Sequence, residues 1–110
     1  MKLIALHTTI GSELQAQELA RAAVAQRLAA CVQIEAIHSL YVWQGELQEE
    51  PEWRLLFKTT DEVAPALMQF VKAHHAYELP AIYTTEVLDA SQEYRAWVQA
   101  AVQAAPQQDT

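Results

Sequence analysis

The sequence predicts an α+β domain of the ferredoxin-like class, in the order β-α-β-β-α-β followed by a third helix. Three observations support this class. Short apolar runs typical of strands alternate with amphipathic stretches at helical spacing. A long central stretch rich in aromatic residues predicts two hairpin strands. The 110 residues are enough for one domain whose core needs neither disulfide nor metal.

The first strand is expected over 2–9, where the chain is apolar and compatible with β-structure. Gly11 and Ser12 end this strand, and Ser12 with Gln15 has the spacing of a helix capping box. An alanine-rich helix is expected to continue to about Ala30. Its predicted inner face consists of Leu19, Ala23, Val24 and Leu28.

A long hairpin is expected next, with strands over 32–43 and 53–59. The apolar phase changes between Ala36 and Ile37, which predicts a bulge or a sharp bend. Gly45 and Pro51 bracket an acidic connection over 46–50. Unbroken, the first strand would span roughly 40 Å, more than the diameter of about 35 Å of a compact domain this size. The hairpin should therefore overhang, and exposed aromatic side chains there predict an obligate oligomer.

The second half of the chain repeats the alternation of helix and strand. Asp61 or Thr60 is expected to cap a helix with Pro65 in its first turn. One stripe of that helix carries Val63, Leu67, Phe70, Val71 and His74. A strand over 81–88 and a helix capped by Asp89 or Ser91 follow. The predicted buried face of this last helix is Tyr94, Trp97, Val98 and Ala101, and the domain is expected to cover 1–104 with a frayed tail over 105–110.

Composition limits the partners. A net charge of −7 and a pI near 4.9 disfavour nucleic acid and anionic membrane surfaces, which need clustered Lys and Arg. No segment approaches the apolar length that spans a bilayer. Cys31 is the only cysteine, so no internal disulfide can form and a reducing cytoplasm is the expected compartment. Cys31 itself is interpreted as a small buried apolar residue.

Four stretches resemble the CutA family, named for tolerance to divalent cations. They are residues 28–32, 39–43 with Gly45, 55–59 preceded by Glu52, and 75–80, with Tyr94 and Trp97 completing the pattern. The resemblance implies a ferredoxin-like protomer in a homotrimer whose hairpins reach across to neighbours. It also implies a non-enzymatic role in tolerance of divalent metal ions, with copper first. Ala76 stands where family members usually carry proline.

Adjacent histidines are the candidate metal ligands. No cofactor is expected to be obligatory. The resemblance implies that His75 and His74 are candidate contacts for Cu(II), although Thr8 stands at the position of an implicated cysteine. Adjacent helical residues point about 100° apart, so the pair cannot easily chelate one ion. In the alternative interpretation His74 completes the apolar stripe and His75 caps the helix. We expect weak or moderate binding through His75, with His74 less accessible.

Two further groups of residues are candidates for subunit contacts. The predicted interface anchors are Tyr41, Trp43, Trp53 and Phe57, since Trp and Tyr are typical anchors. Lys58, Tyr77 and Glu78, with Trp43, could line a pocket between subunits, or Tyr77 and Glu78 could only hold the turn. The acidic residues Glu46, Glu49, Glu50 and Glu52 are interpreted as a solvated hairpin tip.

The residues leave three functional classes open. A metal-binding tolerance protein needs at least three converging ligands. A sensor similar to the PII signalling proteins needs a small-molecule pocket in the cleft between subunits. A structural assembly module needs neither. No hydrolase pattern is found around His38, and the two glycines of the chain, Gly11 and Gly45, cannot form a glycine-rich phosphate loop.

Overall fold

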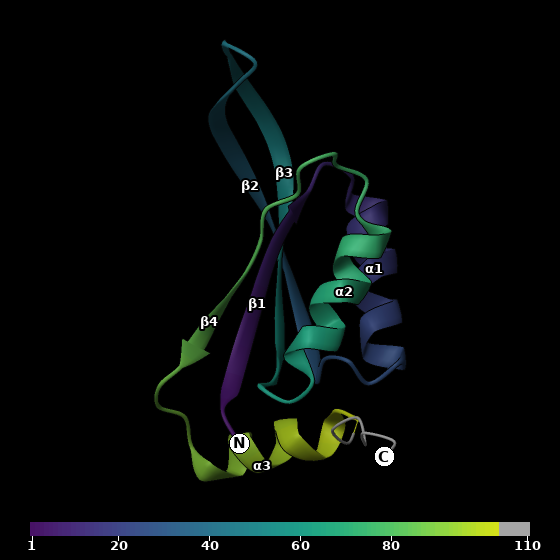
Figure 1. Ribbon diagram of the computed structural model, residues 1–110, viewed down its shortest axis with the longest axis vertical. Helices are drawn as coiled ribbons and strands as arrows, with labels where there is room; N and C mark the ends of the chain where they lie inside the picture. Colours follow the sequence, from purple (N-terminus) through teal and green to yellow (C-terminus); the bar gives the residue numbers. More distant parts are fainter. Residues whose placement is uncertain (104–110) are drawn as a thin grey trace, which may run out of the picture.

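Four antiparallel strands form one sheet, with two helices on one face and a third helix across one end (Figure 1). The computed structural model describes residues 1–103, so the predicted tail over 105–110 lies outside the described residues. In chain order the elements are β1 (Leu3–Ile10), α1 (Glu13–Ala25), β2 (Cys31–Trp43), β3 (Glu46–Thr60), α2 (Ala64–His74), β4 (Ile82–Val87) and α3 (Gln92–Ala101). The predicted α+β class and element order are confirmed.

The strand order β2-β3-β1-β4 is that of the split β-α-β plan. Each helical crossover skips one strand, because β3 lies between β1 and β2 while β1 lies between β3 and β4. The core fills the space between the sheet and the two helices, where Leu6, Leu55, Phe57, Leu67 and Val71 have no measurable exposure. No helix within residues 1–103 is long and apolar enough to cross a bilayer.

Helix α1 begins as predicted and ends earlier than predicted. The hydroxyl oxygen of Ser12 accepts a hydrogen bond from the Gln15 backbone N–H at 3.2 Å. The helix stops at Ala25 because Arg27 adopts a left-handed φ of 58°. The N–H groups of Arg27 and Leu28 bond back to the carbonyls of Val24 and Ala23. This is a Schellman motif with arginine where glycine is usual, and it leaves Val24 exposed rather than on the predicted inner face.

The other two helices differ from prediction in one respect each. Neither Asp61 nor Thr60 caps α2, whose N-cap is Val63 without a side-chain bond. The Asp61 carboxylate instead accepts a hydrogen bond from the Lys2 backbone N–H and so fixes the start of β1. Ser91 caps α3 as predicted. Only Val98 of the predicted buried face of α3 is fully buried, and Trp97 is 51% exposed.

The β2–β3 hairpin is longer and more regular than predicted. Its pairing runs without interruption from Cys31 opposite Lys58 to Trp43 opposite Glu46, so the predicted bulge at Ala36 and Ile37 is wrong. The phase change has another cause: the outer hairpin has no helix against it, so neither of its faces has to be apolar. A hairpin of this length needs no distortion to overhang the domain, as Figure 1 shows.

The acidic connection predicted over 46–50 is part of β3. The turn consists of Gln44 and Gly45, whose φ values of 52° and 81° correspond to the two-residue type I′ hairpin turn. Pro51 is tolerated inside β3 because the pairing of β3 with β1 ends at Trp53, which leaves that edge of β3 open.

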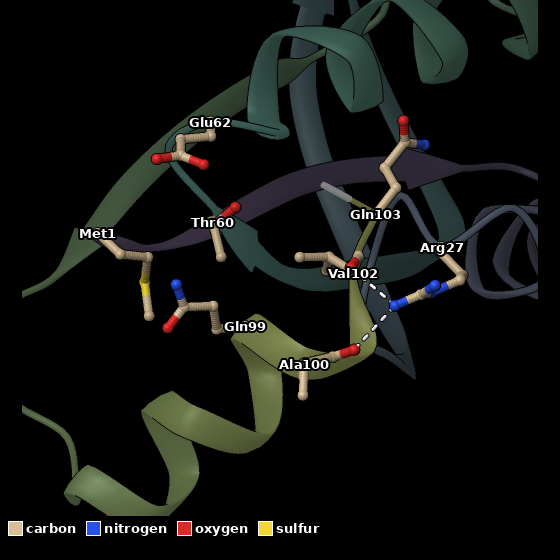
Figure 2. A pocket seen from close by; sticks show the side chains of 8 residues that line it. All are labelled: Met1, Arg27, Thr60, Glu62, Gln99, Ala100, Val102 and Gln103. Atoms are coloured by element: carbon tan, nitrogen blue, oxygen red, sulfur yellow. Dashed lines mark hydrogen bonds between the residues drawn. The ribbon is translucent and has the colours of Figure 1, made fainter. Parts of the chain in front are cut away.

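Arg27 also ties α3 to the end of α1. Its guanidinium donates hydrogen bonds to the carbonyl oxygens of Ala100, Ala101 and Val102 at 2.8 to 3.0 Å. In return its own carbonyl oxygen accepts from the Gln103 N–H at 2.8 Å. Figure 2 shows the guanidinium at the rim of a hollow that Met1, Thr60 and Glu62 also line. A positive charge at a helix C-terminus is favourable, so one side chain satisfies carbonyls that the helix leaves open.

Replacing Arg27 with Met should therefore destabilise the protein by about 2 kcal/mol, since the Ala101 and Val102 carbonyls lose a charged donor. Urea denaturation measured by circular dichroism would give the free energy of unfolding. Arg21→Met is the matched control, because Arg21 is exposed on α1 and should change little. Equal stability of the two variants would contradict a structural role for the Arg27 contacts.

Candidate functional site

The segment between α2 and β4 brings most of the candidate residues together. It leaves the end of α2 at His74, arches over the end of β1 and descends to β4 at Ile82, as the green trace in Figure 1 shows. The ends of β1 and α2 and the root of the hairpin meet beneath this arch. We call residues 75–80 the arch segment.

His75 fastens the arch segment to the end of β1. Its Nε2 lies 2.9 Å from the Thr9 carbonyl oxygen and 3.1 Å from the Thr8 hydroxyl. Its Nδ1 accepts a hydrogen bond from the Tyr77 backbone N–H at 3.1 Å. A carbonyl can only accept and a backbone N–H can only donate, so the neutral ring must carry its proton on Nε2. Both ring nitrogens are thus engaged within the chain.

Tyr77 fastens the same segment to the root of the hairpin. Its hydroxyl donates a hydrogen bond to the Glu52 carboxylate at 2.7 Å. Glu52 is only 6% exposed, so its prediction as part of a solvated hairpin tip is wrong. The hydroxyl lies so close to Gly11 that a Cβ at that position would come within 2.9 Å of it. A side chain at position 11 would therefore have to displace the Tyr77 hydroxyl, so this close approach favours glycine there.

The two rings of the arch segment have shifted pKa values with distinct causes. Burial lowers the pKa of His75 below its usual 6.5, and this outweighs the opposing effects of the Thr9 carbonyl and the Glu52 charge. Burial also raises the pKa of Tyr77, together with its hydrogen bond to Glu52. Both shifts keep the rings neutral at pH 7, the state in which His75 accepts from Tyr77 and Tyr77 donates to Glu52.

The two adjacent histidines face different surroundings. His74 is exposed, and its Nδ1 bonds the Phe70 carbonyl oxygen at 2.8 Å, which leaves Nε2 without a partner within residues 1–103. Its ring packs on Phe70 with a centroid separation of 4.3 Å. The expectation that His74 is the less accessible of the pair is therefore wrong. No group of three or more His, Cys, Asp or Glu within the described residues is placed to hold one metal ion.

The residues predicted to line a pocket between subunits do not meet within one chain. Lys58 lies six positions from Glu52 along β3, or roughly 20 Å, and its Nζ contacts Gln33 at 3.4 Å. Glu78 is exposed on the arch segment, and Trp43 lies at the far end of the hairpin. A pocket made from two chains stays a prediction.

The predicted interface anchors differ in how far their own chain buries them. Tyr41 and Trp43 are 43% and 40% exposed on the overhanging hairpin, and Trp53 is half-buried against the core. Phe57 is completely buried inside its own chain and has no surface to offer a partner, so its prediction as an interface residue is corrected. The alternation of β3 explains the error, because Phe57 lies on the helix-covered face of the sheet.

A second polar cluster lies on the sheet face opposite α1 and α2, and was not predicted. The His7 ring stacks on Tyr83 at 4.7 Å, and its Nε2 lies 2.9 Å from the Thr85 hydroxyl. Burial, and secondarily the nearby charge of Arg54, lower the pKa of His7. The pairing of β1 with β4 creates this cluster, and no local sequence pattern indicates which residues of two distant strands face each other.

The His75 network should make stability depend on pH. The folded pKa of His75 lies below its unfolded value, so on acidification the unfolded state takes up the proton first. The free energy of unfolding should be constant above about pH 7 and fall as the pH drops below about 6.5. His75→Asn should reduce this slope, and His7→Gln measures the separate contribution of His7. An unchanged slope in His75→Asn, from urea denaturation at pH 5 to 8, would contradict the lowered pKa of His75 in the folded state.

Comparison with known proteins gives the family. The family described as CutA1 divalent ion tolerance protein matches residues 4–101. The divalent-cation tolerance protein CutA of Thermus thermophilus is 43% identical over 82% of this chain and 88% of that protein. The structure of CutA from Synechococcus elongatus superimposes with a TM-score of 0.90 at 41% identity, covering 93% of this chain and 91% of that one. That of Archaeoglobus fulgidus, described as a periplasmic divalent cation tolerance protein CutA, gives 0.88 at 28% identity, covering 92% and 99%. The chain therefore belongs to the CutA1 divalent ion tolerance family.

Proposed function

We propose that this protein is a non-enzymatic homotrimer that acts in tolerance of, or response to, divalent metal ions, with copper as the first candidate. Family membership supports the role in divalent ion tolerance, because matching relatives carry that name. The overhanging hairpin, with its exposed aromatic side chains, is the observation that supports the proposed trimer. The cytoplasm is the proposed compartment, which the single cysteine supports, whereas the Archaeoglobus relative is described as periplasmic.

The assembly follows from apolar surface that one chain leaves in water. The outer hairpin exposes Leu40, Tyr41, Val42, Trp43 and Leu47, and no helix covers this outer part of β2 and β3. Further apolar side chains are exposed elsewhere, namely Leu79, Tyr83, Leu88 and Trp97. Contiguous apolar surface of this kind marks a contact with another protein. A symmetric ring of identical chains would cover each hairpin with the next chain.

The protein should migrate as a species of about three times 12.4 kDa in size-exclusion chromatography with light scattering. Trp43→Ala should weaken this assembly, since an aromatic anchor truncated at an interface costs about 2 kcal/mol or more. Glu46→Gln, on the strand position opposite Trp43, is a control that removes charge but little apolar area. A stable monomer for the wild type would contradict the proposed trimer.

His74, rather than His75, is proposed as the first protein ligand of Cu(II). The Nε2 of His74 is accessible, whereas both nitrogens of His75 are held within the chain. His74 lines a hollow of about 380 Å³ between α1 and α2 that also includes Gln15 and the carboxylate of Glu18. Imidazole and carboxylate are both ligands of Cu(II), but so few of them make a weak site.

Calorimetric titration with Cu(II) at pH 7.5 tests this assignment. The wild type should bind weakly, and His74→Ala should lose most of the binding. Thr8→Cys should gain affinity, because a thiolate would replace the hydroxyl that lies 3.1 Å from His75 Nε2. His38→Ala controls for an exposed histidine elsewhere, on the hairpin. Loss of binding in His75→Ala but not in His74→Ala would contradict the proposal.

A sensor similar to the PII proteins is the alternative, because a cleft between subunits at the hairpin root would bring Tyr77 and Glu52 close to a ligand. A thermal-shift panel of metabolites, run beside Cu(II) and Zn(II), separates this alternative from metal binding. A shift with a metabolite alone favours the sensor. A structural assembly module would respond to neither.

A further inference from the structure

Glu52 is a buried carboxylate without a cationic partner in its own chain. It is 6% exposed, and its one hydrogen bond within residues 1–103 comes from the neutral hydroxyl of Tyr77. No Lys, Arg or His lies within ion-pair distance of it among these residues. Residues 104–110 contain no Lys, Arg or His, so the tail cannot supply one. Burying a charge without a counter-charge is costly, which indicates that the cation comes from outside the chain.

Lys58 is a cation without an anionic partner within residues 1–103. It is half-buried, its Nζ makes only a 3.4 Å contact with the amide oxygen of Gln33, and no carboxylate pairs with it within residues 1–103. Both residues have even numbers on β3, so their side chains lie on the same face of the sheet, opposite the core residues Leu55 and Phe57. The distance of roughly 20 Å along the strand prevents them from meeting within one chain.

The other cations of the chain fit Glu52 less well. The Arg54 guanidinium is paired with Glu35 at 2.9 Å, and Arg27 is held by the end of α3. Arg21 and Lys72 lie on α1 and α2, on the face of the sheet opposite to Glu52. Lys2 pairs with Glu86 at 3.7 Å, and Arg95 lies on α3, where it donates to the Leu88 carbonyl oxygen. Within residues 1–103, Lys58 is therefore the half-buried cation without a carboxylate on the sheet face opposite α1 and α2, which we call the open sheet face.

We infer that Glu52 of one protomer pairs with Lys58 of the next protomer when the open sheet face is covered by a second copy of this chain. This inference rests on the proposed trimer. A head-to-tail contact of this kind, repeated around a closed ring, lets every chain donate one carboxylate and one ammonium. Tyr77 positions the Glu52 carboxylate for the contact, and Gly11 leaves the space that the Tyr77 hydroxyl needs. A divalent metal suits this position less well, because no third protein ligand converges there within residues 1–103.

Charge exchange between the two positions tests the inference. The variants are Glu52→Lys, Lys58→Glu and the double exchange, followed by light scattering at rising guanidinium concentration. Each single variant should raise the trimer dissociation constant on the order of 100-fold, because each places like charges together. The double exchange should recover most of that loss. Glu35→Gln is the matched control on the same face, where the partner Arg54 belongs to the same chain and the loss should be small.

Mixing the two single variants distinguishes a contact between chains from any effect within one chain. When Glu52→Lys and Lys58→Glu chains are refolded together, each mixed trimer regains opposite charges where the two kinds of chain meet. Mixed trimers should thus resist guanidinium better than either variant alone. Failure of both the mixture and the double exchange to recover would overturn the inference while leaving the trimer intact. A weaker trimer for the Glu52 variant together with an unchanged trimer for the Lys58 variant would also overturn the inference and indicate another cation. A monomeric wild type would overturn the proposed trimer itself.

Discussion

The uninterrupted pairing of β2 with β3 is the constraint on which the rest of the structure depends. Thirteen consecutive residue pairs, closed by a two-residue turn, extend the hairpin from the sheet to beyond the domain. This geometry places Tyr41 and Trp43 where their own chain cannot cover them. The inner part of the same pairing fixes Phe57 in the core and Lys58 on the opposite face. This register therefore determines which side chains of the hairpin the chain buries by itself and which it leaves exposed for a second chain to cover.

The arch segment completes the root of that hairpin with polar contacts. His75 bonds to β1 and Tyr77 bonds to β3. The arch segment, which has no regular structure, therefore links the end of α2 to both strands. The bond from the Tyr77 N–H to Nδ1 of His75 and the bond from the Tyr77 hydroxyl to Glu52 each need a neutral ring, and burial favours the neutral form of both rings. The contacts of His75 and Tyr77, on either side of Ala76, restrain the segment.

The sequence predicts the periodic elements well because their signals are local. Ser12 and Ser91 cap their helices as expected, and β1, β2 and β4 begin and end within one residue of their predicted bounds, whereas β3 begins seven residues earlier than predicted. Predictions fail where a distant partner decides the outcome. Asp61 bonds Lys2 instead of capping α2, and the Arg27 side chain, at the left-handed residue that ends α1, bonds the end of α3. Both partners lie about 60 or more residues away in sequence, so no local pattern reports them.

The candidate site shows the same division. Adjacent histidines are visible in the sequence, but only the fold shows that His75 is held by two strand residues and that His74 is open to solvent. The same holds for Thr8, whose hydroxyl lies 3.1 Å from the Nε2 of His75 and beside the Thr9 carbonyl oxygen. No local pattern indicates this contact, because Thr8 and His75 are 67 residues apart in the sequence. The attachment of the arch segment to β1 is therefore a property of the fold and not of the histidine pair alone.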